Sequence, residues 1–236
     1  MLMLALGDRP PPTVDDLSDI DTWLFDLDNT LYPADSGLFR QVHRRMGEFI
    51  ERRLGLTPTA ARSLQRRLFE HHGTTLRGLM TEYDVPPNAF LDYVHDIDVS
   101  VLRPNPDLGA AIKGLPGRKL VFTNGSTGHA TRVLGQLGIT TDVFDAIEDI
   151  VASEFQPKPN PTVYERMVER HRIDPRRAIM VEDMAANLAP AHAMGMTTVW
   201  VRTDHATAAP GTVDEHIHHV VDDVFTWLRD LSFQPA

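Results

Sequence analysis

One apolar strand near the start of the chain is separated from every other predicted strand by a long helical stretch. Residues 21–27 have the apolar character of an inner strand, whereas apolar residues in 38–93 recur at three- and four-residue spacing. Strands and helices alternate only after residue 104. This order is typical of an α/β fold in which a mostly parallel sheet is covered by helices on both faces. A helical insertion then interrupts the α/β domain after its first strand.

The other boundaries follow from apolar runs, prolines and glycines. Pro58, Gly73 and the pair Pro86-Pro87 divide the insertion into short helices. Residues 1–18 are predicted to form a tail, because three consecutive prolines block regular structure there. We predict further strands over 119–122, 143–147, 178–181, 197–201 and 218–221, and further helices over 107–115, 129–137, 160–171, 185–194 and 224–231.

The first strand ends in a turn that carries two aspartates, Asp26 and Asp28. Residues two apart in an extended backbone point the same way, so both side chains are expected at the carboxyl end of the strand, where open α/β sheets bind ligands. Two carboxylates this close repel each other unless a cation or a shared proton intervenes. We therefore predict a divalent metal beside one carboxylate and proton transfer by the other. A solvated turn is the alternative for this motif taken alone.

Polar side chains also follow two later strands and the loop between them. Thr123-Asn124-Gly125 follows one strand, Glu182-Asp183 follows another, and Lys158 lies in a proline-rich loop. Each motif alone could be a turn, a helix cap or a solvated residue. Together they place a hydroxyl, a lysine and acidic groups in one crevice. Such a set suits phosphoryl transfer, in which a carboxylate attacks phosphorus while Mg²⁺ and lysine neutralise the phosphate oxygens.

Charge and composition narrow the classes of partner. A net charge of −10 over 236 residues repels nucleic acid polymers and anionic membranes, and an anionic substrate such as a small phosphorylated metabolite would need local cationic groups. The absence of cysteine excludes disulfides and thiolate chemistry, and no P-loop motif is present. The apolar run 1–6 is too short for a signal peptide and no stretch approaches a membrane span, so a cytoplasmic protein is expected. The oligomeric state does not follow from the sequence.

The motifs, in their order, resemble those of the haloacid dehalogenase-like hydrolase superfamily. The stretch Phe25-Asp26-Leu27-Asp28-Asn29-Thr30-Leu31-Tyr32-Pro33 is similar to the opening motif of its pyrimidine 5′-nucleotidase-like branch. Residues 72–79, 93–98 and 122–130 are similar to that branch as well. Over residues 21–202, the resemblance implies a Rossmann-like core with an inserted helical cap. The expected division is 1–18 for the tail, 19–33 and 104–236 for the core, and 34–103 for the cap.

The resemblance also implies a role for each motif residue. Asp26 would be the nucleophile that forms an aspartyl-phosphate, and Asp28 the general acid/base. Dehalogenases of the superfamily lack this second acid, so Asp28 favours phosphate ester hydrolysis. Thr123 and Lys158 would hold the phosphoryl group beside Asn124 and Gly125. Mg²⁺ would be bound by the side chains of Asp26 and Asp183 and the backbone carbonyl of Asp28, with Glu182 and Asn187 supporting them.

The substrate is predicted to be a pyrimidine nucleoside monophosphate, UMP or CMP, with phosphoglycolate or a sugar phosphate as the alternative. Thr74, Thr75 and Arg77 are the preferred contacts in the insertion, because a break between helices offers hydroxyls and backbone donors at a loop. The alternative for each is a packing or solvated residue. His95 and His129 are weaker candidates that we expect to be structural.

Two alternatives come from a different class: a phospho-signalling receiver, and a binding protein that has lost the chemistry. The order of the acidic motifs argues against the first and the intact aspartates argue against the second. His216, His218 and His219 could hold a metal, but we expect them in a solvated segment.

Overall fold

The computed structural model describes residues 9–203 and 215–231. Six parallel strands form one sheet in the order β3-β2-β1-β4-β5-β6. The strands are β1 (Thr22–Phe25), β2 (Arg118–Phe122), β3 (Ala146–Glu148), β4 (Ala178–Glu182), β5 (Thr197–Val201) and β6 (His219–Val221). The predicted α/β fold with a Rossmann-like parallel sheet is confirmed.

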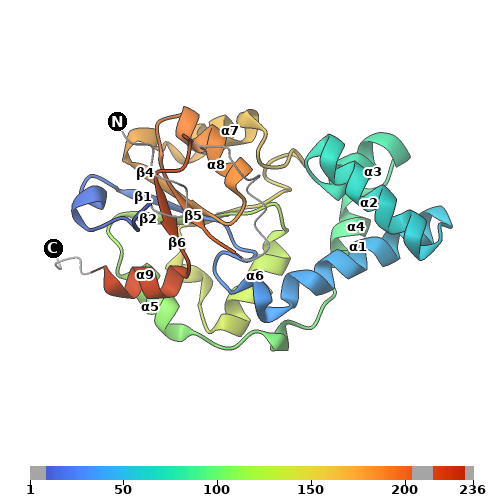
Figure 1. Cartoon of the computed structure of the whole chain (residues 1–236), viewed down its shortest axis with the longest axis horizontal. Helices are drawn as coiled ribbons and strands as arrows, with labels where there is room; N and C mark the ends of the chain where they lie inside the picture. Colours follow the sequence, from blue (N-terminus) through green and yellow to red (C-terminus); the bar gives the residue numbers. More distant parts are fainter. Residues whose placement is uncertain (1–8, 204–214, 232–236) are drawn as a thin grey trace.

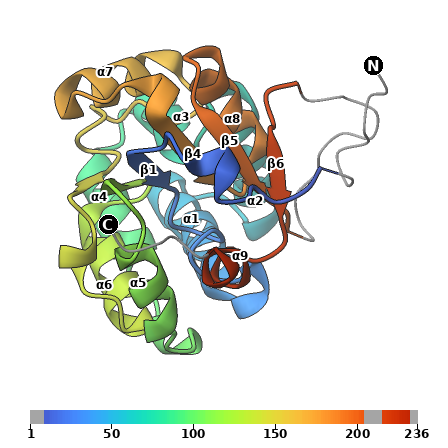
Figure 2. The ribbon, with the colours of Figure 1, turned by 90° about the vertical axis from the view of Figure 1, so that its left-hand side faces the viewer.

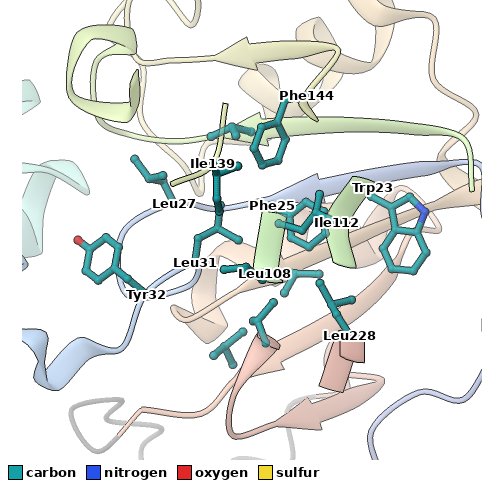
Figure 3. Close-up of a cluster of buried hydrophobic side chains, with 14 of the residues drawn as sticks. Trp23, Phe25, Leu27, Leu31, Tyr32, Leu108, Ile112, Ile139, Phe144 and Leu228 are labelled. Carbon is teal, nitrogen blue, oxygen red and sulfur yellow. The ribbon is translucent and has the colours of Figure 1, made fainter. Parts of the chain in front are cut away.

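Helices cover both faces of this sheet (Figures 1 and 2). The helices α5 (Pro106–Lys113), α6 (Thr127–Leu137) and α9 (Val224–Asp230) pack on one face, and α7 (Pro161–His171) and α8 (Ala185–Ala193) pack on the other. Trp23 and Phe25 of β1 point into the first hydrophobic cluster (Figure 3), whereas Leu24 points into the second. A strand buried on both faces needs apolar residues throughout, which explains the apolar run before the first aspartate.

Four further helices form a separate group beside the sheet, which we call the α1–α4 unit (Figure 1). They are α1 (Leu38–Leu54), α2 (Pro58–His72), α3 (Thr75–Tyr83) and α4 (Pro87–Val94). The unit has its own hydrophobic cluster, which includes Val42, Leu68 and Phe90. Ile150 and Phe155, from the loop after β3, pack into the same cluster. Apolar contacts therefore join this unit to the part of the chain that carries the sheet.

The predicted breaks between these helices fall at the observed boundaries. Thr57 caps α2 by accepting a hydrogen bond from the Ala60 amide, and Pro58 occupies the first turn, where its missing N–H does no harm. Gly73 ends α2 with φ +79°, a left-handed conformation that suits glycine. Proline and glycine residues that are visible in the sequence therefore set the ends of α2.

Two predicted strands are shorter than expected. A strand over 21–27 was predicted, but β1 ends at Phe25, and Asn29 turns the chain with φ 63°, a conformation that asparagine tolerates. The prediction of a strand over 143–147 was wrong, because Thr141–Val143 forms a 3₁₀ turn and only Ala146–Glu148 pairs with β2. This strand lies at the edge of the sheet and pairs only with β2. Its paired residues are therefore fewer than the apolar residues of 143–147 suggested.

The described part of the predicted tail packs against the core instead of projecting from it. Leu17 is fully buried in the first hydrophobic cluster, and the Trp227 indole donates to the Pro12 carbonyl at 3.1 Å. The apolar run 1–6 lies outside the described residues. Within the described ranges, no helix combines the length and the apolar character that a membrane crossing requires.

Candidate active site

Three neighbouring strands at the centre of the sheet end in the polar motifs. Asp26 follows β1, Thr123 follows β2 and Glu182 ends β4. The three strands are parallel and adjacent in the order β2-β1-β4, so their carboxyl ends meet at one edge of the sheet. Residues predicted from separate motifs are thus brought to one place.

The Lys158 ammonium is buried at this edge, with only 2% of the residue exposed. It donates to Asp26 Oδ1 at 2.9 Å, to Glu182 Oε2 at 2.6 Å and to the Phe122 carbonyl at 2.7 Å. Burial alone would lower the pKa of Lys158, but the charges of Asp26 and Glu182 outweigh burial and raise it. Lys158 therefore stays a cation and uses its three N–H donors within the site.

Asn124 holds the backbone of Lys158 through both ends of its amide. Its Oδ1 accepts from the Lys158 amide at 2.8 Å, and its Nδ2 donates to the Lys158 carbonyl at 3.2 Å. We predicted Asn124 as a substrate contact, but these polar atoms of its side chain bond to the backbone of the loop that carries Lys158, which we call the lysine loop. Thr123 Oγ1 accepts from the Gly125 amide at 2.9 Å. A side chain at Gly125 would lie 3.3 Å from both Thr123 Oγ1 and His129 Cδ2, so glycine lets these two side chains approach the loop closely.

Asp28 makes a different set of contacts from Asp26. Its Oδ1 accepts a hydrogen bond from the Tyr32 hydroxyl at 2.6 Å and lies 2.8 Å from His129 Nε2. Burial is the largest influence on the pKa of Asp28 and acts to raise it, but His129 and Tyr32 together outweigh burial and lower the pKa. The sequence analysis missed both contacts. The available signal was the place of His129 in the first turn of the helix that follows the Thr123 motif.

Three carboxylates form a group that could hold a metal ion. One oxygen each of Asp26, Glu182 and Asp183 lie within 4.8 Å of one another, and no other such group of acidic or histidine side chains occurs among the described residues. Burial and then the charge of Glu182 raise the pKa of Asp26 to about 7. Burial and the neighbouring carboxylates likewise raise the pKa of Asp183 to about 9. A bound cation would relieve this repulsion, so the donor set fits a metal.

Two of the three carboxylates have oxygens left for a cation. Glu182 accepts hydrogen bonds on both oxygens, from Lys158 on Oε2 and from the Met184 amide on Oε1. It therefore supports the neighbouring groups instead of offering a free oxygen to a cation. Asp26 commits Oδ1 to Lys158, and Asp183 receives a long 3.4 Å contact from the Asn29 amide on Oδ2. The amide oxygen of Asn187 is buried and has no hydrogen-bond partner among the described residues. It is a further oxygen acceptor in the helix that follows Asp183.

Comparison with known proteins identifies the family. The sequence model of the haloacid dehalogenase-like hydrolases matches residues 20–195. The chain belongs to the haloacid dehalogenase-like hydrolase family.

Individual proteins and solved structures can also be compared with this chain. The chain is 27% identical over 192 residues to phosphate metabolism protein 8 of Saccharomyces cerevisiae, and the alignment covers 74% of this chain and 59% of the yeast protein. The chain thus spans less than two thirds of that relative's length. Among solved structures, a HAD phosphatase from Thermococcus onnurineus superimposes with TM-score 0.60 at 18% identity, covering 89% of this chain and 96% of its own. CbbY from Rhodobacter sphaeroides, in complex with phosphate, superimposes with TM-score 0.58 at 21% identity. This match covers 86% of this chain and 94% of CbbY.

A dehalogenase shares the fold too. The L-2-haloacid dehalogenase of Xanthobacter autotrophicus, with chloropropionic acid covalently bound, superimposes with TM-score 0.55 at 16% identity, covering 89% of this chain and 97% of its own. At these identities the structural matches establish the fold alone. The reaction of this hydrolase must therefore be argued from its own side chains.

The predicted contacts in the α1–α4 unit lie at the start of α3. Thr74 caps this helix by accepting from the Arg77 amide at 3.1 Å, and Thr75 is buried. A side chain at Gly73 would lie 3.5 Å from Pro157 Cγ, so this turn adjoins the loop that carries Lys158. The Arg77 guanidinium has no ion-pair partner within the described part of the chain. The stretch therefore sits next to the lysine loop of the hydrolase and carries an available cation.

The C-terminal histidines do not gather around one point. His216 Nε2 lies 2.9 Å from the Ala185 carbonyl, His218 Nδ1 accepts from the Thr198 amide at 3.0 Å, and His219 Nδ1 lies 3.2 Å from the Pro10 carbonyl. As expected, the segment is partly solvent-exposed, with His218 exposed and His216 and His219 half-buried, but it leads into the edge strand β6 and its histidines contact three different parts of the chain.

A cavity of about 590 Å³ opens beside the carboxylates. It is lined by the turn that contains Asn29 and Tyr32 and by the segments after β5 and β6, and neither Asp26 nor Lys158 lines it. The charged groups converge at the carboxylates, none of which lines this cavity.

Proposed function

We propose that this hydrolase cleaves phosphomonoesters through an aspartyl-phosphate on Asp26, with Mg²⁺ as cofactor. The observation that carries the proposal is the second carboxylate, Asp28, which is hydrogen-bonded beside the Asp26–Lys158 pair. Loss of an alkoxide from phosphorus requires a proton donor, and a carboxyl held in this position can supply it. The names of the yeast relative and of two structural neighbours, which refer to phosphate metabolism, a phosphatase and a phosphate complex, agree with this choice.

In the first half of the reaction, an oxygen of Asp26 attacks phosphorus. The bond from phosphorus to the ester oxygen breaks, and a proton that Asp28 would carry in the substrate complex moves to that oxygen to release the alcohol. Lys158 and the Thr123 hydroxyl stabilise charge on the phosphoryl oxygens. The product of this half-reaction is the aspartyl-phosphate and a carboxylate at Asp28.

In the second half, water attacks the phosphorus of the aspartyl-phosphate. Asp28 now accepts a proton from the water, and the bond between phosphorus and Asp26 breaks to release inorganic phosphate. Asp28 thereby regains the proton it gave up, and the site returns to its starting state.

Mg²⁺ would be held by the side chains of Asp26 and Asp183 and by the backbone carbonyl of Asp28. Bound there, it would neutralise the charge that the phosphate brings to a cluster of carboxylates. Glu182 keeps Lys158 in place, and Asn187 supports the ligands from α8. The raised pKa values of Asp26 and Asp183 support a cation at this position.

The α1–α4 unit would act as a cap that selects the substrate. We propose a pyrimidine nucleoside monophosphate, UMP or CMP, with Thr75 and Arg77 among the contacts to the nucleoside side. The Arg77 guanidinium, which has no ion-pair partner among the residues that the structure describes, and the closeness of Gly73 to the lysine loop support this part of the proposal.

The test is phosphate release from a panel of phosphomonoesters, with and without Mg²⁺. The panel contains UMP, CMP, purine monophosphates, phosphoglycolate and sugar phosphates. Wild type is compared with Asp26→Asn and with Asp92→Asn, a control on the exposed side of α4. We expect Mg²⁺-dependent release that favours UMP or CMP, is lost in Asp26→Asn and persists in Asp92→Asn.

The other outcomes separate the parts of the proposal. Release that spreads over phosphoglycolate or sugar phosphates would keep the mechanism and discard the nucleotide assignment. Robust turnover by Asp26→Asn would exclude the covalent mechanism. A folded wild type that binds Mg²⁺ and releases phosphate from nothing in the panel would contradict the proposed activity.

A further inference from the structure

Two donors converge on a single oxygen of Asp28. The Tyr32 hydroxyl donates to Oδ1 at 2.6 Å, and His129 Nε2 lies 2.8 Å from the same atom. Tyr32 is 2% exposed and the His129 side chain is fully buried, so water does not compete for these contacts. Tyr32 belongs to the first hydrophobic cluster, and Figure 3 shows it at the edge of that cluster, with its hydroxyl pointing away from the other labelled side chains. Both contacts are therefore held by rigid surroundings.

The second oxygen of Asp28 faces the loop expected to hold the phosphoryl group. A side chain at Gly125 would lie 3.6 Å from Asp28 Oδ2 and 3.3 Å from both Thr123 Oγ1 and His129 Cδ2, so Oδ2 lies close to Gly125 and the Thr123 loop. A carboxyl oxygen that already accepts two hydrogen bonds has no lone pair left for a proton. Oδ2 is thus the oxygen of Asp28 that is left to exchange a proton with a ligand.

The His129 ring is itself fixed, by a residue of the α1–α4 unit. The rings of His129 and His95 stack with centroids 4.3 Å apart and planes 11° from parallel. His95 lies directly after α4, and its Nδ1 is 3.0 Å from Ser126 Oγ while its carbonyl accepts from Arg132. His129 Nδ1 is buried without a partner among the described residues, so Nε2 is the nitrogen that donates.

We propose that His129 and Tyr32 are positioning residues that hold Oδ1 of Asp28, so that Oδ2 is the oxygen that faces the leaving group. This inference rests on the proposed phosphomonoesterase activity. It assigns a role to two side chains that do not touch the substrate and act through Asp28. The stacking of His95 extends the same arrangement to the α1–α4 unit.

The proposal makes the effect of a mutation depend on the leaving group. When the bond from phosphorus to an alkyl ester oxygen breaks, that oxygen must receive the proton from Oδ2, because an alkoxide is a poor leaving group. The p-nitrophenolate ion leaves without being protonated, since it is a weak base. For a reaction with a covalent intermediate, kcat/KM reports the steps up to aspartyl-phosphate formation. A misplaced Asp28 proton therefore lowers kcat/KM for alkyl esters selectively.

The experiment measures kcat/KM for the best alkyl phosphomonoester of the panel and for p-nitrophenyl phosphate. The variants are Tyr32→Phe, His129→Leu and His129→Gln, with Asp28→Asn as the reference for loss of the proton carrier. We expect a fall of about 10- to 100-fold on the alkyl ester for Tyr32→Phe and His129→Leu, and less than about 3-fold on p-nitrophenyl phosphate. His129→Gln, which keeps an N–H donor, should recover part of the loss. His71→Gln, on the exposed end of α2, is the control.

Misfolding is separable from loss of positioning. Tyr32→Phe removes a single oxygen from a ring that stays packed, so it answers the question even where His129→Leu does not fold. Equal losses on both substrates, or no loss in a folded Tyr32→Phe while Asp28→Asn is selective, would overturn the positioning role. A wild type that hydrolyses neither substrate would instead overturn the proposed function.

Discussion

The edge of the sheet and the start of α3 use their polar side chains in opposite ways. At the sheet edge, hydrogen bonds join residues far apart in the sequence: Lys158 reaches Asp26 across 132 positions, and His129 reaches Asp28 across 101. At the start of α3, Thr74 bonds to the amide of Arg77 three positions away, and the guanidinium of Arg77 has no ion-pair partner in the described ranges. Mutations at the sheet edge should therefore change both stability and rate, whereas mutations at α3 should change binding.

The largest effect is expected for Lys158→Met. This change leaves Asp26 and Glu182 buried without their counter-ion, so the unfolding free energy of the metal-free protein should fall by about 3–5 kcal/mol. Phosphate release should fall by a factor on the order of 10³, because the phosphoryl oxygens lose a fixed cation. Denaturant titration and phosphate release measure the two quantities. Lys113→Met, at the exposed end of α5, is the matched control and should change stability by less than about 0.5 kcal/mol. If Lys158→Met is as stable as the wild type, the Lys158 contacts to Asp26 and Glu182 do not stabilise the fold.

Asp28→Asn should come next in size and affect the two halves of the reaction unequally. With p-nitrophenyl phosphate, the first half needs no proton, but the second half loses the base that accepts a proton from water. The turnover number should fall by about 10²-fold while the aspartyl-phosphate accumulates. Acid quenching followed by mass spectrometry of the intact protein detects the phosphorylated chain. Full turnover without accumulation would show that Asp28 is not the base, and Asp92→Asn serves as the exposed control.

Asp183→Asn should raise the stability of the metal-free protein and abolish its response to Mg²⁺. The pKa of Asp183 is raised to about 9 from 3.8, so the folded chain binds this proton more tightly than the unfolded chain does. Its contribution to stability therefore decreases as the pH rises between these two values. At pH 8 the amide removes that penalty, and the melting temperature should rise by roughly 2–4 °C. Thermal melts with EDTA and with Mg²⁺ test this, and a mutant that keeps the Mg²⁺ shift would remove Asp183 from the metal site.

The smallest effect is expected at α3. Thr75→Val and Arg77→Ala should each raise KM for the best nucleotide by roughly tenfold, as for the loss of one hydrogen bond to a charged group, and leave kcat nearly unchanged. Arg66→Ala, on the exposed face of α2, is the matched control. Steady-state kinetics decide the point. If both variants keep the wild-type KM, substrate recognition lies elsewhere in the α1–α4 unit.

The fold could be predicted in large part, because local signals set its elements. Apolar runs marked β2, β4 and β5, and the breaks at Pro58 and Gly73 marked the helix ends. The edge strand β3 has other bounds than predicted, and Leu17, in the described part of the predicted tail, is buried in the core. Periodicity cannot reveal how many neighbours a strand has or what a short segment packs against. Those facts depend on distant residues.

The sequence by itself determined which residue types end the central strands. Asp26, Thr123 and Glu182-Asp183 each follow an apolar run, and parallel strands must bring such ends to one edge. Only the tertiary structure decided how these groups divide the work. In the folded chain Asp26 bonds to Lys158, whereas Asp28 contacts His129 and Tyr32. Hydrogen bonds form between groups that are close in space, whatever their separation in the sequence. A histidine 101 positions from its aspartate leaves no spacing signal, so its role emerges only from the folded chain.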